Sequence, residues 1–485
     1  MKSTLMKTLL YAFVLVIFFS CNSNKNDEIL TYTTDTTLGL SRVNLKEISN
    51  KIPVDKILKE KKNLQAEEKL FLQLVNKPGE SGIDIDKPLY FIVDQGKTNS
   101  EFDAKAFMWI NDKAKFQTSM SNLTKSKVTI DNKDNILING QLVGNMKGEM
   151  AIMVSEKAYN PYGGYNSMNS SMPQGSERIN AQYFTDFWAR KGTKNAAIKE
   201  QINKSLVGDK DVSGWVNLAA VASFASKGYI ETLAINKLIK DSGIGFDFNF
   251  GKGKAEMSTN TFFNSDMKKI VEKYYDKNKV NYDLVKNVEL DNAKSYTIGF
   301  FSLDFMKYLV KEAGFEATIN HYLASSNKSL EDITSTFTGD YAFVDFKVKQ
   351  DTTDYYNYRS DNAIVLGFNP KNKATLTSLM DQYLTSAGKK YIVTDNEVIV
   401  SDNAEVLSQF QTKKEGKNAS LDKKSGIMSY SWSDGKDYNQ KENATVKIIN
   451  MVNESKEEGG NLVSKSTFTL DKKDENALYY LLMND

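Results

Sequence analysis

The residue types that most often perform catalysis are scarce in this chain. His321 is the single histidine and Cys21 the single cysteine among 485 residues. One histidine cannot supply the two-histidine set of a zinc protease, and no Gly-x-Ser-x-Gly turn is present to expose a serine nucleophile. The sequence therefore predicts no catalytic residue, no metal site and no cofactor, and it places His321 on a helix as a structural or surface side chain.

Acidic and glycine-rich motifs also favour structural roles. Asp84 and Asp86 form an Asp-x-Asp motif like that of some metal-binding glycosyltransferases, but they directly precede the strand that starts at Pro88, which favours a turn. The Asp131–Asp134 segment lacks the glycine and the distal glutamate of a calcium loop. Gly251–Lys254 lacks the spacing of a phosphate-binding loop and is interpreted as a hairpin turn. Two carboxylates in one cleft would suffice for a glycosidase, so that chemistry stays open.

Two tyrosine-rich segments are the candidate contact surfaces for a ligand or partner. They lie within 159–175 and 350–359, where the chain is otherwise rich in Asn, Ser, Gly, Asp and Thr. An exposed tyrosine offers a flat apolar ring and a hydroxyl, which suit stacking on sugars or contact with a protein. Packing of these loops onto the sheet is the alternative. The candidate residues are Tyr159, Tyr162, Tyr165, Tyr355, Tyr356 and Tyr358.

The N-terminus has the pattern of an export signal. Lys2 and Lys7 precede the apolar run Leu9–Phe19, which is shorter than the roughly 20 residues that a bilayer-spanning helix needs. The run ends at Ser20-Cys21, and this junction resembles the cleavage site of bacterial lipoproteins. The resemblance implies a signal peptide over residues 1–20 and lipid attachment, including palmitate, at Cys21.

The segment after the cysteine is polar and is predicted to be a flexible tether over residues 21–35. Acyl chains on Cys21 would anchor the protein permanently, because each buried methylene contributes about 0.8 kcal/mol. We therefore expect a lipid-anchored protein of the bacterial cell envelope, most simply in the outer membrane. The sequence leaves open whether the protein faces the periplasm or the cell surface.

Composition predicts a large folded body with a near-neutral surface. The apolar fraction is 40%, enough for a substantial core, and 63 Lys and Arg balance 61 Asp and Glu. No global positive field attracts nucleic acid. The lone cysteine leaves no partner for a disulfide, so stability must come from burial.

Helical and strand patterns alternate irregularly along the chain. Lys46–Ile57 has helical spacing, Pro88–Val93 is typical of a buried strand, and Gly245–Thr259 alternates as an antiparallel hairpin. Most strand connections are short, which favours antiparallel pairing. The expected fold class is α+β, with twisted antiparallel sheets and helices packed on one side.

Several short segments recur in the same order and predict a diverged internal duplication. Residues 43–45 match 216–218, residues 81–83 match 242–244, and Gly148–Ile152 matches Gly339–Phe343. The expected units are residues 36–212 and residues 213–485, the second with a C-terminal β extension.

The Cys21 signal, the segment Ser81–Phe91 and the two Gly-acid-x-Ala strands at Gly148 and Gly339 give the chain a family resemblance. It resembles lipoproteins of the Bacteroidetes that contain domain of unknown function 4836. The resemblance implies an envelope location and a repeated α+β fold, and it brings no catalytic residue.

Three functions fit these observations. The favoured one is a non-catalytic envelope protein that binds a partner or scaffolds an assembly. The second is a glycan-binding or carbohydrate-hydrolysing lipoprotein, suggested by the loop tyrosines. The third is a lipid carrier or assembly chaperone with an apolar groove. The expected partners are the membrane, through the acyl chains, and an envelope protein or glycan, but not nucleic acid.

Overall fold

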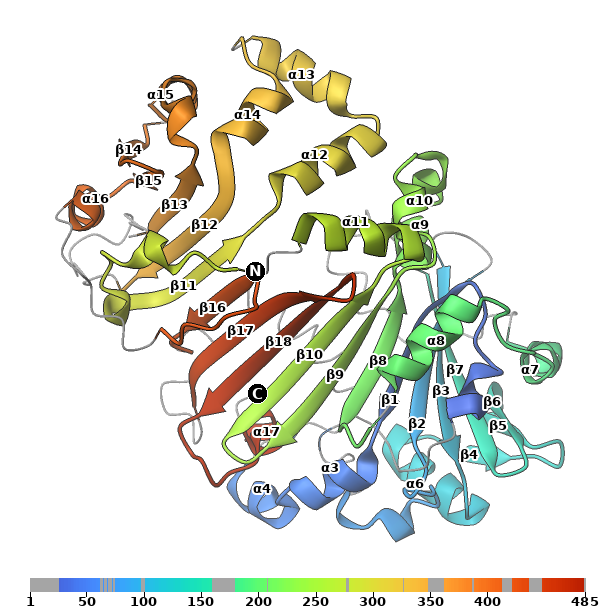
Figure 1. Ribbon diagram of the computed structural model, residues 1–485. Helices are drawn as coiled ribbons and strands as arrows, with labels where there is room; N and C mark the ends of the chain where they lie inside the picture. The colour runs from blue at the N-terminus through green and yellow to red at the C-terminus, as the bar shows by residue number, and fades with distance from the viewer. Residues whose placement is uncertain are drawn as a thin grey trace.

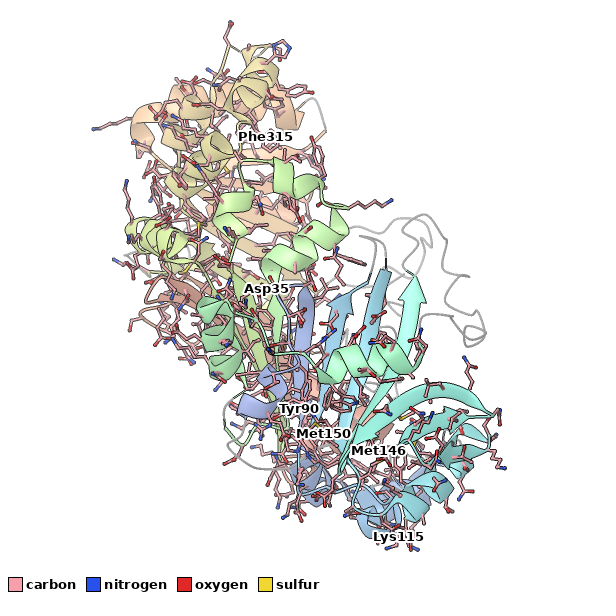
Figure 2. The ribbon with its side chains drawn as sticks, turned by 90° about the vertical axis from the view of Figure 1, so that its right-hand side faces the viewer. Asp35, Tyr90, Lys115, Met146, Met150 and Phe315 are labelled. Atoms are coloured by element: carbon pink, nitrogen blue, oxygen red, sulfur yellow. The ribbon has the colours of Figure 1, made fainter. Side chains whose placement is uncertain are left out.

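The computed structural model describes residues 26–61, 64, 68, 72, 75–96, 101–158, 179–206, 208–275, 279–325, 327–347, 362–385, 388–411, 421–435 and 447–483. Within them, eighteen strands form a single sheet (Figure 1). Helices fill many of the connections, so the expected α+β class is confirmed. The body is long, with Phe315 and Lys115 at opposite ends (Figure 2).

Every neighbouring strand pair in the sheet is antiparallel. The first half of the sheet, in spatial order, contains β14 (Lys390–Val393), β15 (Glu397–Ser401), β13 (Asn362–Phe368), β12 (Phe337–Phe346), β11 (Ala293–Phe300), β16 (Ser429–Ser433), β17 (Ile448–Glu458) and β18 (Asn461–Leu470). The second half continues through β10 (Lys254–Phe262), β9 (Gly243–Gly251), β8 (Val212–Asn217), β1 (Thr37–Val43), β2 (Leu89–Gln95), β3 (Glu101–Trp109), β7 (Met150–Ala158), β6 (Gln141–Lys147), β5 (Asn135–Ile138) and β4 (Val128–Ile130).

The helices are short, and several begin at a side chain that caps their first turn. Asp112 Oδ1, for example, accepts the N–H of Lys115 at 3.0 Å. The described helices are α2 (Asn26–Leu30), α3 (Leu45–Lys51), α4 (Val54–Glu60), α6 (Lys113–Thr124), α7 (Ala181–Trp188), α8 (Ala196–Ser205), α9 (Leu218–Ala225), α10 (Asn236–Ile239), α11 (Ser265–Tyr275), α12 (Leu303–Glu312), α13 (Glu316–Ala324), α14 (Leu330–Thr336), α15 (Lys373–Met380), α16 (Ala404–Gln411) and α17 (Ala477–Met483). The helix expected over Lys46–Ile57 is two helices, separated near Pro53.

One topology recurs along the sheet. β1–β2–β3, β8–β9–β10, β11–β12–β13 and β16–β17–β18 are each three strands in which consecutive members pair. The first strands pair with each other, β1 with β8 and β11 with β16. The third strands β10 and β18 join the two halves. The recurrence is a property of the topology, and a common origin of the two units stays a prediction.

Two of the three recurring sequence segments occupy matching places in this topology. Asn44 follows β1 and caps α3, as Asn217 ends β8 and caps α9. Gly82 lies shortly before β2, and Gly243 starts β9. The third pair does not match, because Gly148 lies in the turn between β6 and β7 whereas Gly339 lies inside β12. The boundary expected between residues 212 and 213 falls inside β8.

Helices pack on both faces of the sheet, which corrects the expected one-sided arrangement. Neighbouring residues of a strand point to opposite faces. On β15, Val398 clusters with Leu379 of α15, whereas the next residue, Ile399, clusters with Phe410 of α16. Each face of this part of the sheet therefore has its own core.

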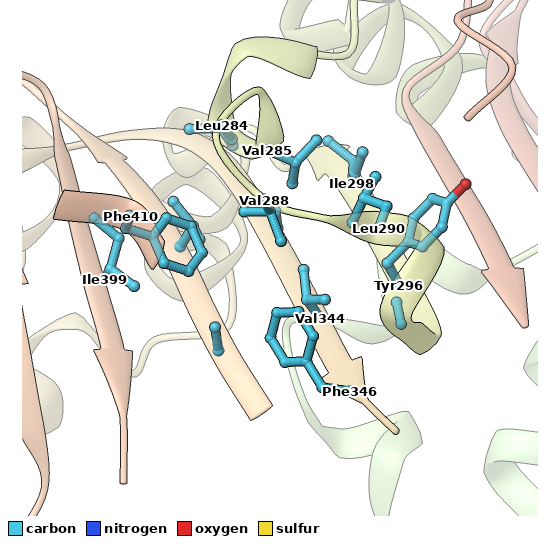
Figure 3. Packing of buried hydrophobic residues seen from close by; sticks show 14 of the residues in the cluster. Leu284, Val285, Val288, Leu290, Tyr296, Ile298, Val344, Phe346, Ile399 and Phe410 are labelled. Carbon is cyan, nitrogen blue, oxygen red and sulfur yellow. The ribbon is translucent and has the colours of Figure 1, made fainter. Parts of the chain in front are cut away.

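The largest described core of the C-terminal half lies under a 3₁₀ turn over Tyr282–Val285. Figure 3 shows Val285 and Leu290 beside Ile298 and Val344. These side chains are fully buried, so this cluster holds the chain after α11 against β11 and β12.

The last ten residues of the expected tether belong to the folded body, so the predicted tether over 21–35 is wrong for residues 26–35. Ile29 and Tyr32 are buried, with 2% and 5% of their surface exposed. The Tyr32 ring stacks on Phe187 of α7, with centroids 5.2 Å apart. The apolar residues of this polar segment find partners far along the sequence, which a composition argument does not detect.

Candidate functional site

The sequence-predicted contact residues lie outside the described part of the chain. This applies to the predicted lipid-attachment residue and to both tyrosine-rich segments, so the structure neither supports nor opposes these predictions. The residues concerned are Cys21, Tyr159, Tyr162, Tyr165, Tyr355, Tyr356 and Tyr358.

The acidic motifs are turns, as predicted. Asp84 Oδ1 accepts the backbone N–H of Asp86 at 3.0 Å, immediately before β2. Asp131 Oδ1 accepts the N–H of Asn135 at 2.9 Å in the turn between β4 and β5. Gly251 pairs with Lys254 across the β9–β10 hairpin. Each motif thus satisfies the backbone locally.

His321 is exposed on α13. Among the described residues, no three His, Cys, Asp or Glu side chains are grouped to hold a metal ion. No helix in the described ranges is long and apolar enough to span a membrane.

A buried ionic cluster lies on β2 and β3. Asp94 Oδ2 accepts hydrogen bonds from Lys105 Nζ at 2.9 Å and from Arg190 Nη1 at 2.7 Å. Its other oxygen accepts the Thr37 hydroxyl proton at 2.6 Å. Arg190 Nη1 also donates to the carbonyl oxygen of Tyr32 at 2.8 Å. The cluster therefore joins the N-terminal segment, the sheet and the loop after α7.

The cluster keeps its charges in balance inside the fold. Burial alone would raise the pKa of Asp94, but the neighbouring cations Lys105 and Arg190 outweigh it and lower this pKa. Burial lowers the pKa of Lys105, and Asp94 opposes that shift. Burial also raises the pKa of Tyr183, whose hydroxyl donates to Asp103 at 3.3 Å. Both Asp94 oxygens are occupied by protein donors, which suits a structural clamp rather than a reacting group.

One shallow surface depression lies on α8. Its lining residues all come from this helix: Ala196, Lys199, Glu200, Asn203 and Lys204. With no second element in its lining, the depression has no wall to enclose a ligand.

A more distinctive surface lies in the middle of the sheet, on β11, β16, β17, β18 and β10. Directly paired residues on neighbouring strands share a face. The register gives one row that runs Thr297, Ser431, Asn453 and Ser466, and a second row that runs Ser429, Ser455, Ser464 and Thr259. We call these eight partly buried residues the polar floor.

The floor residues form hydrogen bonds with one another across the strands. Asn453 Nδ2 donates to Ser464 Oγ at 3.0 Å and to Ser466 Oγ at 2.7 Å. The Ser455 hydroxyl donates to Ser464 Oγ at 3.1 Å, and the hydroxyls of Thr297 and Ser431 are 2.9 Å apart. A serine hydroxyl has one donor and two acceptor positions, so these bonds use part of its capacity.

On β17, β18 and β10 the opposite face carries charged residues, whereas on β11 and β16 it belongs to the buried core, with Tyr296, Ile298 and Tyr430. Glu454 and Lys456 alternate with the floor residues on β17, and Lys465 does so on β18. Lys465 Nζ lies 2.9 Å from Glu256 of β10, and this hydrogen bond lowers the pKa of Glu256. We call this surface the charged face. It is the kind of sheet surface that water solvates, whereas the polar floor contains no charged residue.

Apolar side chains border the floor on both sides. On one side, Thr297 pairs with Phe343, and Phe343 pairs with Ile364. These two apolar side chains are 40% and 39% exposed. On the other side, Ser466 pairs with Met257, which pairs with Phe248, and Phe248 packs against the core that contains Phe250. The result is a strip of hydroxyl and amide groups between two apolar borders.

Such a surface can bind but has no groups for catalysis. Hydroxyls and amides donate and accept hydrogen bonds without carrying charge. A nucleophile would need a nearby base, and glycoside hydrolysis would need two carboxylates. The eight floor residues include neither a base nor a carboxylate.

The polar floor was not predicted from the sequence, although alternating serines indicate part of it. Serines alternate with aromatic residues in Ser429–Ser433, and Ser464 and Ser466 flank Lys465. Such alternation predicts a serine-lined strand face. Its continuation across five strands depends on the strand order, which joins segments far apart in the sequence.

Comparisons with known proteins do not identify the chain. No protein-family model matches it, and no curated protein is similar to it. A solved structure titled "Structure of crystal form III of TP0453" aligns at a TM-score of 0.27 and 7% identity, over 52% of this chain and 88% of the other. A likeness this low carries no functional argument.

Proposed function

We propose that this chain is a lipid-anchored protein of the bacterial cell envelope and that it binds a partner, without catalysis, through the polar floor. The anchoring part rests on the signal-like N-terminus that ends at Cys21. The binding part rests on the contrast between the two faces of β10, β17 and β18.

The charged face and the polar floor can be compared directly because both belong to the same strands. The charged face has ion pairs such as Lys465–Glu256. The eight floor residues, one position away along each strand, are all uncharged, and Glu457 follows Ser455 on the same face of β17. Depletion of charge distinguishes the cores of interfaces from ordinary protein surface.

The N-terminal segment supports a position close to the membrane. The fold begins by Ile29, which is buried against α7 and α8. The stretch from Cys21 to Ile29 reaches at most about 30 Å when fully extended. An acylated Cys21 would therefore hold the body beside the bilayer surface rather than on a long tether.

Thiol labelling in isolated envelopes tests the binding role. With Cys21 acylated, the chain has no free thiol, so a new cysteine can be labelled selectively. Ser466→Cys places a thiol on the floor, and Thr467→Cys places one on the opposite face of the same strand. Both positions are partly buried.

We expect a maleimide to label the S466C variant more slowly in envelopes than after purification in detergent. The T467C variant should be labelled at the same rate in both. Equal rates in the two preparations for S466C would show an unoccupied floor and contradict the binding role. Slow labelling of both variants in envelopes would indicate general crowding and also contradict it.

A further inference from the structure

We infer that the ligand of the polar floor is a neutral glycan. This inference rests on the proposed binding role and adds the class of ligand. It follows from three properties of the surface: its lack of charge, its density of hydroxyl groups and its apolar borders.

The lack of charge selects against ionic ligands. An anionic polymer or a phosphate-bearing headgroup loses solvation on binding and needs cations to compensate. The floor offers none, because its eight residues are Ser, Thr and Asn. The lysines of these strands, such as Lys465 and Lys456, belong to the charged face. A neutral ligand has no charge to be compensated, so it does not need such partners on the floor.

The spacing of the polar groups suits a molecule with many hydroxyls. Neighbouring strands lie about 4.8 Å apart, and alternate residues of a strand are about 6.8 Å apart. Ser431, Asn453 and Ser466 thus form a regular grid with Ser429, Ser455 and Ser464. Sugar hydroxyls both donate and accept hydrogen bonds, as these side chains do.

The borders suit the apolar faces of sugar rings. Phe343 and Ile364 are a directly paired, exposed couple beside Thr297. Sugar rings carry C–H groups on their faces, and an aromatic ring such as Phe343 gives those groups an apolar surface to cover. A glycan lying across the floor would contact the hydroxyl grid and this border together.

Other occupants fit less well. Two sheets that stack face to face interdigitate apolar side chains. A second copy on the floor would instead bury serine hydroxyls such as Ser431 and Ser464, at a cost wherever they lose a partner. Protein interfaces are enriched in Tyr, Trp and Arg and depleted in Ser. Occupation of the floor by a second copy or by another protein is therefore an alternative that the test can reveal.

The test uses the full lipidated chain in detergent micelles. An array of neutral oligosaccharides is compared with sulfated and uronic-acid oligosaccharides of the same length. Titration calorimetry then measures the tightest neutral binder. We expect binding to neutral members and little binding to the charged ones.

A matched pair of variants locates the binding surface. Ser466→Asp adds a carboxylate to the floor, and Ser258→Asp makes the same change on β10 on the opposite face, where Ser258 pairs with Lys465. Because a carboxylate must be desolvated under the ligand, S466D should weaken binding on the order of tenfold or more. S258D should leave the affinity within about twofold. Thermal melts confirm that both variants fold.

The outcomes separate this inference from the proposed function. Any of three results would overturn the inference that the ligand is a neutral glycan. They are the absence of a neutral binder, equal binding of acidic oligosaccharides, and unchanged binding by S466D. If S466C were still protected in envelopes, the floor would bind another class of partner and the binding role would stand. If that protection were absent too, both proposals would fail.

Discussion

Lys105 and Arg190 share one oxygen of Asp94. Lys105 Nζ lies 2.9 Å and Arg190 Nη1 lies 2.7 Å from Asp94 Oδ2. The Lys105 side chain is fully buried, and that of Asp94 is 4% exposed. Two carboxylates therefore face two cations at the point where the N-terminal segment meets the sheet, because Asp103 Oδ2 also lies 3.8 Å from Lys105 Nζ.

Removing Asp94 should cost more stability than removing Lys105. Asp94→Asn leaves Arg190 without its carboxylate partner and Lys105 with only the more distant Asp103, and we expect a loss of about 3 kcal/mol, because breaking a buried pair leaves charge uncompensated. Lys105→Met keeps the Asp94–Arg190 pair and fills similar volume, so the loss should be about 1 kcal/mol. Urea unfolding followed by circular dichroism measures both. Equal losses would show that the cluster does not act as one balanced unit.

The contribution of Asp94 should disappear in acid. Burial would raise its pKa, but Lys105 and Arg190 lower it below that of an unfolded aspartate, which is about 3.9. A carboxylate with a lowered pKa stabilises the fold above its unfolded pKa, and this stability is lost as pH falls through the folded pKa. The stability difference between wild type and D94N should thus be constant at neutral pH and shrink below about pH 4. A difference independent of pH down to pH 3 would contradict this.

Tyr90 should tolerate loss of its hydroxyl. Its ring is buried on β2, burial raises the pKa of its hydroxyl to about 12, and this hydroxyl has no hydrogen-bond partner among the described residues. Tyr90→Phe removes a buried polar group that lacks a partner, so stability should rise by up to about 1 kcal/mol. Thermal melting measures the change. A lower melting temperature would mean that the hydroxyl has a partner, such as a bound water.

Tyr32 should behave as a core residue although it lies in a polar segment near the N-terminus. Its ring contacts Phe107 and Phe187, with centroids 5.1 and 5.2 Å away. Tyr32→Ala should destabilise the fold by about 3 kcal/mol or more, as large-to-small core changes do. Hydrogen exchange gives a second measurement, because the amide of Tyr32 should be protected. Rapid exchange there, with unchanged stability of the variant, would restore the flexible tether over residues 26–35.

Local elements were predictable because their signals lie within a few residues. Alternation of Phe246, Phe248 and Phe250 predicted the β9–β10 hairpin, which the structure confirms. The run Pro88–Val93 predicted a buried strand, and β2 covers Leu89–Gln95. The run Leu89–Val93 is apolar at every position, and this pattern also indicates helices on both faces of the sheet. A strand that is apolar at every position is buried on both faces, and such strands imply helices on both sides of the sheet.

Long-range order was not predictable in the same way. β1 pairs with β8 and β10 pairs with β18, although each pair is separated by many residues. The polar floor exists only because these pairings align serines from distant strands. The core position of Tyr32 likewise depends on Phe187 and Arg190, which no local pattern connects to it.

The proposed location depends on the state of Cys21, because acylation there would hold the whole body at a membrane. Mass spectrometry of the N-terminal peptide from the native membrane fraction measures this state directly. We predict a chain that starts at Cys21 and carries a diacylglycerol thioether on its sulfur, and we predict that Cys21→Ser moves the protein out of that fraction. A chain that starts at Met1, or a Cys21 without lipid, would contradict the account.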